Sequence, residues 1–285
     1  ENMHVGTMIP HFKKGDFDKL MLQIPNRTSQ EFIGGIYRTL SDKIELNRRM
    51  NETLESMARA IFKSWFVDFD PVRAKMDGQQ PAGMNPETAA LFPDSFEEQD
   101  GEMIPKGWRF ARVADIGKVI CGKTPSTKVT EYYGNDVPFI TIPDMHGKIF
   151  PITTKKRLSF AGVESQRKKT LPVGAICVSC IATPGLTVMT LEESHTNQQI
   201  NSVVPHDSTA KYFWFWTLHG LGEVIRAGGS GGSVLSNLST GRFSELRVLS
   251  PPEHLRSEYH NAVRGQFGRL LANERECQTL ANLRD

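Results

Sequence analysis

The sequence lacks the features that would place the chain in a membrane or in an oxidising compartment. It has only four cysteines in 285 residues, too few for the disulfide framework of a small secreted domain. No apolar run approaches the roughly 20 residues that a membrane-spanning helix needs, and the first residues carry no signal-peptide pattern. We therefore expect a protein of the reducing cytoplasm without membrane contact.

The chain also lacks a strong net charge, although its charges are unevenly distributed. The total is +2. Segment 68–102 holds nine acidic and two basic residues, a net of −7, whereas segment 106–250 holds seventeen basic and ten acidic residues, a net of +7. A basic block of this size can bind a polyanion even within a nearly neutral protein.

Catalytic and metal-binding signatures are missing as well. No metalloprotease, nucleophile-elbow or zinc-deaminase pattern occurs. Cys177 and Cys180 match C-x-x-C, but they lie in an apolar strand pattern, where residues three apart point to opposite faces. No second pair completes a zinc site. We therefore predict core cysteines and no metal site.

One stretch matches the residue pattern of a phosphate-binding P-loop. The stretch GKVICGKT (117–124) fits G-x-x-x-x-G-K-[ST]. A P-loop needs a buried strand before the motif and an amphipathic helix that starts at its Lys-Thr pair. Pro125 follows at once, however, and the next residues, STKVTEYYG, are rich in β-branched side chains. The residues on either side of the motif therefore disfavour a P-loop NTPase that uses Lys123 and Thr124. This NTPase is kept as an alternative.

The chain repeats itself at a constant offset of 226 residues. Segment 6–25 aligns with segment 232–251, and the match continues without a gap through Asn47, which meets Asn273, to Leu54, which meets Leu280. The repeat unit consists of a globular part, a strand-like tail and a long helix. One unit is complete, and only the tail (1–27) and helix of another precede it. We therefore expect the chain to start inside a longer protein, after a truncated first domain.

Apolar residues at spacings of three and four predict two long helices, over 28–67 and 252–285. The first opens with a capping box, with Thr28 as the N-cap and Glu31 three positions later. Helices of this length suggest a coiled coil, and the repeat favours antiparallel pairing in a rigid rod. The alternative is two ordinary amphipathic helices on a core. The residues expected at the helix interface are Leu40, Asn47, Leu54, Ile61, Trp65, Leu270, Asn273 and Leu280.

Between the helices, the sequence changes character twice. Segment 68–105 is rich in proline, glycine and acid and indicates a linker. Segment 106–251 contains short β-rich runs such as VPFITI and AICVSCIA, which predict a mixed α/β domain. Its basic residues cluster in irregular stretches, where Lys and Arg can neutralise phosphates and neighbouring polar side chains can read base edges. The alternative is a set of solvated basic loops.

Three stretches have their pattern in common with one protein family. They are LNRRMNETLESMARAIFKSWFVDFDPVRAKM (46–76), GKTPSTKVTEYYGNDVPFITIPDMHG (122–147) and GGSVLSNLSTGRFSELRVLSPP (231–252). The first resembles the central conserved region of type I restriction-modification specificity subunits. The other two resemble the opening and the close of their target-recognition domains. The resemblance covers essentially the whole chain.

This resemblance implies an α/β (mixed α+β) target-recognition domain on a long antiparallel two-helix coiled coil. It implies a non-catalytic subunit in which the domain reads one half of a bipartite double-stranded DNA target. The helices would set the spacing and dock methyltransferase subunits. S-adenosylmethionine, ATP and magnesium are then expected on these subunits and on a restriction or translocase subunit, with no cofactor in this chain.

With a single recognition domain, the chain would read one half-site unless it forms a homodimer through its helices. A coiled-coil adaptor that does not read DNA is the remaining alternative. The candidate DNA-binding residues are Lys155, Lys156, Arg157, Arg167, Lys168 and Lys169 for phosphates, Lys123, Ser126, Tyr133 and Gln166 for bases, and Lys128 in the same loop as Ser126.

Overall fold

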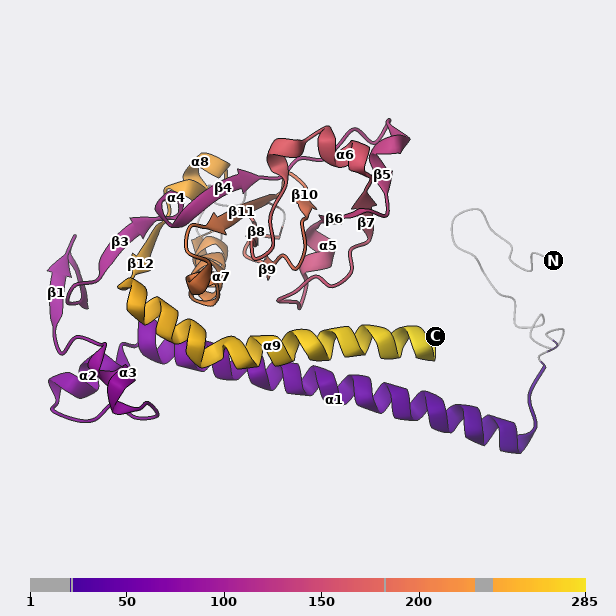
Figure 1. Ribbon diagram of the computed structural model, residues 1–285, viewed down its shortest axis with the longest axis horizontal. Helices are drawn as coiled ribbons and strands as arrows, with labels where there is room; N and C mark the ends of the chain where they lie inside the picture. Colours follow the sequence, from indigo (N-terminus) through magenta and orange to yellow (C-terminus); the bar gives the residue numbers. More distant parts are fainter. Residues whose placement is uncertain (1–20, 22, 182, 229–237) are drawn as a thin grey trace.

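A computed structural model describes residues 21, 23–181, 183–228 and 238–285. A long pair of helices carries a domain of sheets and shorter helices along one side (Figure 1). Most of the segment expected to be the tail of a preceding domain (1–27) lies outside the described residues. The architecture agrees with the predicted combination of a mixed domain and two long helices.

The two long helices are α1 (Arg27–Phe66) and α9 (Glu253–Arg284). They pack side by side and run antiparallel (Figure 1). The Tyr259 hydroxyl, near the start of α9, donates to the carbonyl of Ala58 near the end of α1 at 2.9 Å. The Cys277 thiol, near the end of α9, lies 3.7 Å from the carbonyl of Ile44. The pairing is therefore antiparallel, as the repeat favoured.

The first turn of α1 corrects one expectation. Asn26, not Thr28, is the N-cap, because its Oδ1 accepts a hydrogen bond from the backbone N–H of Ser29 at 2.9 Å. Glu31 pairs instead with Arg27, one helical turn before it, at 2.7 Å. A carboxamide on a residue in extended conformation caps a helix as well as a hydroxyl does, so the sequence offered two competing starts.

Segment 68–105, predicted as an acidic linker, is folded, and its helical turn in the stretch PETAALF is present as a short helix. Three of its apolar side chains, Val72, Phe92 and Ile104, are at most 3% exposed and belong to the main core. Their burial holds the intervening prolines and acids in short helices and a hairpin. The elements are α2 (Asp70–Met76), α3 (Pro86–Ala90), β1 (Phe96–Gln99) and β2 (Glu102–Pro105).

The domain that follows contains two four-stranded sheets. The antiparallel core sheet has the order β4-β11-β8-β9, and the outer sheet has the order β10-β6-β7-β5, in which β10 and β6 are parallel. A ribbon of β12 and β3 joins the end of the domain to its beginning. The strands are β3 (Arg109–Arg112), β4 (Gly117–Cys121), β5 (Tyr133–Gly134), β6 (Val137–Ile140), β7 (Lys156–Leu158), β8 (Ile176–Ser179), β9 (Thr187–Met189), β10 (His195–Thr196), β11 (Ile200–Pro205) and β12 (Arg247–Ser250).

Short helices connect these strands, and one longer helix covers the core sheet. The helices are α4 (Val113–Ile116), α5 (Ile142–Met145), α6 (Phe160–Glu164), α7 (Lys211–Gly228) and α8 (Thr240–Ser244), with 3-10 turns η2 (Thr130–Tyr132), η3 (Arg167–Lys169) and η4 (Ser208–Ala210).

Both faces of the core sheet are buried. The alternating residues Ile176, Val178 and Cys180 belong to the main core with α7, whereas Cys177 belongs to a second cluster beneath the outer sheet. A strand covered on both sides needs apolar residues at nearly every position, which explains the run AICVSCIA. The two cysteines are buried on opposite faces, as the strand pattern predicted.

Aromatic rings attach the domain to the helix pair. Phe66 of α1 lies between Phe213 of α7 and Tyr259 of α9, with ring centroids 4.8 and 5.5 Å away. Farther along the pair, Phe150 from the loop after α5 meets Phe267 of α9 at 6.3 Å. Both contacts belong to one continuous core, so the domain packs on the helix pair along several turns of α9.

Candidate nucleic-acid interface

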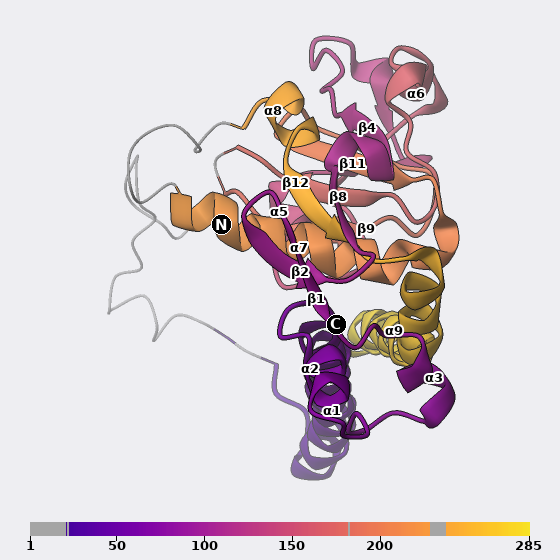
Figure 2. The same cartoon turned by 90° about the vertical axis from the view of Figure 1, so that its left-hand side faces the viewer.

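The basic residues concentrate on the outer lobe, defined as segments 122–171 and 190–199, which contain the outer sheet, α5 and α6. Together the two segments hold nine basic and six acidic residues, a net of +3. Helix α6 and strand β5 lie on the side of the domain away from the helix pair (Figure 1), and Figure 2 shows the same position for α6. The acidic segment with α2 and α3 lies at the far end of the helix pair, so it does not cover this lobe.

An open hollow of about 460 Å³ lies on the outer lobe. Lys155 and Lys156 are exposed at this hollow, at the start of β7. The structure provides neither ammonium group with a carboxylate partner among the described residues, so both are available to an external anion. The remaining lining residues are Thr127, Tyr133, Gly134, Asn135, Thr154 and Arg157.

Arg157 has a different environment from its two lysine neighbours. Its Nε donates to the carbonyl of Asn135 at 3.0 Å, and its Nη2 donates to the carbonyl of Asp136 at 2.9 Å. Its Nη1 lies 3.5 Å from a carboxylate oxygen of Glu192. The guanidinium is thus engaged in holding the turn between β5 and β6. The structure does not support the expectation that Arg157 is a free phosphate contact.

The loop after β4 holds three of the predicted contacts in a fixed position. The Tyr133 hydroxyl donates to the carbonyl of Pro125 at 2.8 Å, and partial burial raises the pKa of this phenol. The Thr124 hydroxyl donates to Oε1 of Gln198 at 2.6 Å. The side chains of Lys123, Ser126 and Lys128 are exposed on the braced loop. Tyr133 therefore positions the loop, and its hydroxyl is already used.

Gln166 lies in the interior, where it cannot meet a base. It is 6% exposed, and its amide nitrogen lies 3.2 Å from Nδ1 of His195. The Thr170 hydroxyl lies 3.0 Å from Nε2 of the same ring. Burial lowers the pKa of His195 to about 4, so the ring is neutral at pH 7. The expectation of a base contact at Gln166 is corrected, because the side chain serves a buried polar network.

The neighbouring basic turn η3 is on the surface. Arg167 and Lys168 are exposed, and Lys169 is half-buried. Arg167 makes a long ion pair with Glu164 at 4.0 Å between two highly exposed side chains. Such surface pairs contribute little stability, so a phosphate can compete for this guanidinium.

The motif GKVICGKT does not form a P-loop. Strand β4 is the edge strand of an antiparallel sheet, and the residues after Thr124 form an irregular loop that leads only to the short turn η2. Gly122 is required for packing, because a Cβ there would lie 2.1 Å from the carbonyl oxygen of Asn197. The local structure thus explains the motif without a nucleotide, and the NTPase alternative is not favoured.

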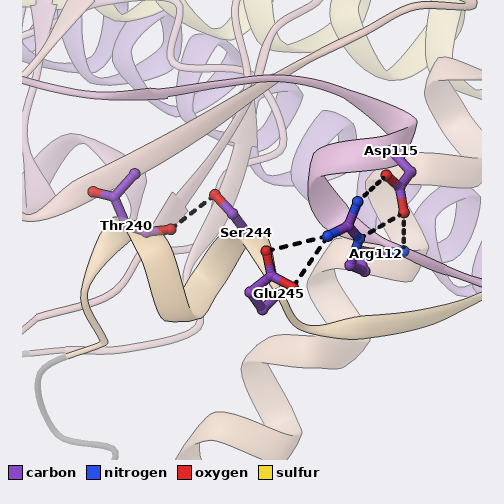
Figure 3. A network of polar contacts seen from close by, with 5 residues as sticks. All are labelled: Arg112, Asp115, Thr240, Ser244 and Glu245. Carbon is purple, nitrogen blue, oxygen red and sulfur yellow. Dashed lines mark hydrogen bonds and ion pairs between the residues drawn. The ribbon is translucent and has the colours of Figure 1, made fainter.

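A surface network ties the beginning of the domain to its end (Figure 3). Arg112 forms two bonds to the carboxylate of Asp115, at 2.9 and 3.0 Å, and reaches Glu245 after α8 at 3.4 Å. The hydrogen bonds from Arg112 lower the pKa of Asp115 to about 2. Every charge in this network is paired, so its role is to close the domain.

The helix interface contains most of its predicted residues. Asn47, Trp65, Leu270 and Asn273 are buried, whereas the other predicted interface residues are half-buried. The latter are Leu40, Leu54, Ile61 and Leu280.

Within the part of the chain that the structure describes, no group of three or more His, Cys, Asp or Glu residues could hold a metal ion. In the same part, no helix is long and apolar enough to span a membrane.

Sequence reasoning missed Asn135, which lines the hollow beside the two lysines. It lies in the tripeptide Gly134-Asn135-Asp136, a combination typical of turns between strands. That signal could have placed it on an exposed turn, but its proximity to Lys155 depends on the pairing of β5 with β7.

Comparisons with known proteins agree with this geometry. A family model described as the type I restriction modification DNA specificity domain matches residues 105–254. The chain is 39% identical over 316 residues to the type I restriction enzyme HindI specificity subunit of Haemophilus influenzae, covering 97% of this chain and 69% of that protein. It is 26% identical to the type I restriction enzyme MjaIX specificity subunit of Methanocaldococcus jannaschii, with coverages of 98% and 61%.

A solved structure supports the fold. The S subunit of a type I restriction-modification system from M. genitalium superposes with a TM-score of 0.58 at 15% identity, covering 99% of this chain and 66% of that one. The chain spans about two thirds of the length of these relatives.

Proposed function

The chain belongs to the family of type I restriction-modification DNA specificity subunits, and we propose that its outer lobe is the surface that binds double-stranded DNA. The observation that carries this proposal is the open hollow with Lys155 and Lys156 at its edge. The lobe holds nine basic and six acidic residues, a net charge of +3, and is turned away from the helix pair. Such a surface attracts phosphates, and polar side chains between the lysines can contact bases.

Phosphate contacts are the part of this proposal that a salt titration tests. The exposed residues Lys123, Lys128, Lys155, Lys156, Arg167 and Lys168 are the proposed contacts. Loss of one phosphate contact lowers the slope of log K against log salt by about 0.9. We expect Lys155→Ala and Lys156→Ala each to produce this decrease, measured by DNA binding between low and physiological salt.

Lys106 provides the matched control, because it is exposed outside the outer lobe. Lys106→Ala is expected to leave the slope unchanged. If both lobe variants bind DNA with the slope of the unaltered protein, the DNA-binding surface lies elsewhere. If the protein together with methyltransferase subunits shows no salt-dependent DNA affinity, the adaptor alternative is correct.

The helix pair is proposed to set the spacing of a bipartite target and to dock methyltransferase subunits. Leu46 and Met57 of α1 are 54% and 50% exposed. They are 11 residues apart, close to three helical turns, so they lie on one face. The double substitution Leu46→Glu and Met57→Glu is expected to abolish co-purification with methyltransferase subunits and to leave the melting temperature unchanged.

A second recognition domain is proposed to cover the start of α1. Phe32, Ile33 and Tyr37 are 70%, 56% and 53% exposed. At the offset of 226 residues, Ile33 and Tyr37 correspond to Tyr259 and Val263, which are fully buried beneath this domain and the end of α1. The covering domain comes from the same polypeptide or, in a homodimer, from a second copy. Light scattering of the protein at increasing concentration distinguishes these sources.

Membership of this family suggests which subunits perform the catalytic steps. We propose that this chain performs no catalytic step and binds no cofactor. S-adenosylmethionine, ATP and magnesium would be bound by the methyltransferase subunits and a restriction subunit, in the cytoplasm where the DNA is. Sequencing of methylated positions in a host that expresses the complete system would give the target and test this assignment directly.

A further inference from the structure

The turn between β5 and β6 presents Asn135 at the edge of the hollow, between the loop after β4 and the start of β7. Asn135 is exposed and lines the hollow together with Lys155 and Lys156. Within the described part of the chain, no hydrogen bond engages its side-chain amide. An exposed carboxamide beside two unpaired ammonium groups is available to an external ligand.

The backbone beneath this side chain is held from several directions. Arg157 donates to the carbonyls of Asn135 and Asp136 at 3.0 and 2.9 Å. The N–H of Asp136 donates to the carbonyl of Leu158 at 3.1 Å, and the Asp136 carboxylate accepts the N–H of Phe160 at 3.2 Å. The turn is therefore braced through both its carbonyl and its amide groups.

Helix α6 and the residue before it pack on η2, the 3-10 turn that leads into β5. A Cβ on Gly162 would lie 2.1 Å from the carbonyl oxygen of Tyr132, so α6 approaches η2 as closely as a backbone allows. The Ser159 N–H also donates to that carbonyl, at 3.1 Å. A side chain on such a fixed backbone loses little conformational freedom on binding, and this is the condition for selective recognition.

The chemistry of the side chain selects a ligand. A carboxamide places a donor and an acceptor in one plane, and this pair matches N7 and the N6 amino group of adenine in the major groove. A hydroxyl such as that of Ser126 can donate or accept and discriminates less. Lys155 and Lys156 lie beside Asn135 where phosphates flanking a contacted base would be held.

On the basis of the proposed function, we infer that Asn135 reads an adenine in the half-site and that Arg157 is the positioning residue that fixes it. The two residues then affect different quantities from the lysines. Asn135 determines which base is accepted. Arg157 determines how strongly that base is preferred over the others. Lys155 and Lys156 determine the affinity for DNA of any sequence.

The test uses the protein in complex with its methyltransferase subunits and a pool of randomised DNA duplexes. The unaltered complex is expected to select a motif that contains an adenine. Asn135→Ala should remove the preference at one adenine and weaken binding to the selected duplex about 10- to 100-fold, the discrimination of one bidentate base contact. The salt slope should stay unchanged, because no phosphate contact is lost. Asn261→Ala removes an exposed carboxamide from α9, and it should leave the motif intact.

Arg157 is tested by two further variants. Arg157→Lys keeps the charge but cannot donate to both carbonyls. It should therefore weaken the preference for adenine at the position assigned to Asn135, without a change in salt slope. Glu192→Gln removes the charge that pairs with Arg157 and leaves both carbonyl bonds, so it should retain the motif. A salt slope lowered by about 1 in Arg157→Ala, with the motif intact, would assign Arg157 to a phosphate and refute the positioning role.

The failures are distinguishable. A complex that selects no motif refutes the proposed function itself. If the unaltered complex selects a motif and the Asn135→Ala complex selects the same motif with equal discrimination, only the role of Asn135 is refuted. Because Asn135 is exposed, its replacement should not change the melting temperature, which is measured for every variant.

Discussion

Asn273 donates its side-chain amide to Oδ1 of Asn51 at 2.9 Å, although 222 positions separate them in the sequence. Asn51 in turn donates to the carbonyl of Leu270 at 3.3 Å, and one turn away Asn47 donates to Glu276 at 2.8 Å. These bonds cross the apolar seam between α1 and α9. Polar bonds in such a seam can be made in only one register, so they fix how far each helix is displaced along the other.

Removal of the Asn273 amide should destabilise the helix pair. Asn273 is 1% exposed, and Asn273→Ala leaves Oδ1 of Asn51 without this donor. The expected loss is about 1–3 kcal/mol in the free energy of unfolding, measured by urea denaturation. Asn261→Ala on the exposed face of the same helix should cost less than about 0.5 kcal/mol. Equal effects of the two variants would show that the bond does not stabilise the pair.

The buried ring of His195 should make stability depend on pH. Its pKa is lowered by burial to about 4 in the folded protein, against about 6.5 in an unfolded chain. The neutral ring therefore stabilises the fold fully above pH 6.5, and this contribution is lost as the pH falls towards 4.

A difference of about 2.5 pKa units corresponds to at most about 3 kcal/mol. The free energy of unfolding of the unaltered protein, minus that of His195→Gln, should decrease between pH 7 and pH 4. A constant difference over that range would exclude a neutral His195 as the cause.

Glu274 should make the free energy of unfolding depend on pH in the opposite direction to His195. It lies at a cavity of about 400 Å³ between the helix pair and the loop that carries Lys148. Burial raises its pKa to about 7, opposed by Lys148 and reinforced by Glu55. A raised carboxyl pKa means that the folded state is favoured while the group is protonated and loses stability as the pH rises through 7.

Glu274→Gln should therefore match the unaltered protein near pH 4.5 and be the more stable of the two at pH 8, by on the order of 1–3 kcal/mol. Denaturation at both pH values measures this. Greater stability of the unaltered protein at pH 8 would mean that the ionised Glu274 is favourably paired, for example with Lys148.

Lys123 distinguishes a DNA contact from a nucleotide site. We expect magnesium-ATP to leave the melting temperature of the protein unchanged, and Lys123→Ala to lower the salt slope of DNA binding by about 0.9. Gly122→Ala should destabilise the fold with or without nucleotide, because a Cβ would collide with the carbonyl of Asn197 at 2.1 Å. An ATP-dependent rise in melting temperature that Lys123→Ala abolishes would restore the NTPase alternative.

The long helices were predictable from the sequence because their signal extends over many turns. The apolar spacing of α1 and the repeat shared by Asn47 and Asn273 indicated both the helices and their pairing. Local signals were less decisive. Asn26 and Thr28 offered competing caps two residues apart, and only the path of the chain selects between them.

The candidate site was less predictable, because it depends on contacts between distant segments. Lys155, Arg157 and Gln166 lie within a dozen residues of one another and all suit nucleic-acid contact by type. The structure exposes the first, ties the second to the carbonyls of another turn, and buries the third against His195. Polarity alone cannot distinguish these environments, because those of Arg157 and Gln166 depend on partners more than 20 positions away.

The contact between Phe150 and Phe267 has a mechanical consequence. Contacts at a single point would let the outer lobe rotate on the helix pair, whereas contacts spread along the helices prevent this rotation. The rings around Phe66 pack near the start of α9 at Tyr259, and Phe150 packs about two turns farther along at Phe267, within the same core. The angle between the outer lobe and the axis of the helix pair is thus set by the fold. Under the proposed function, a DNA half-site would have to be presented at that angle to be read.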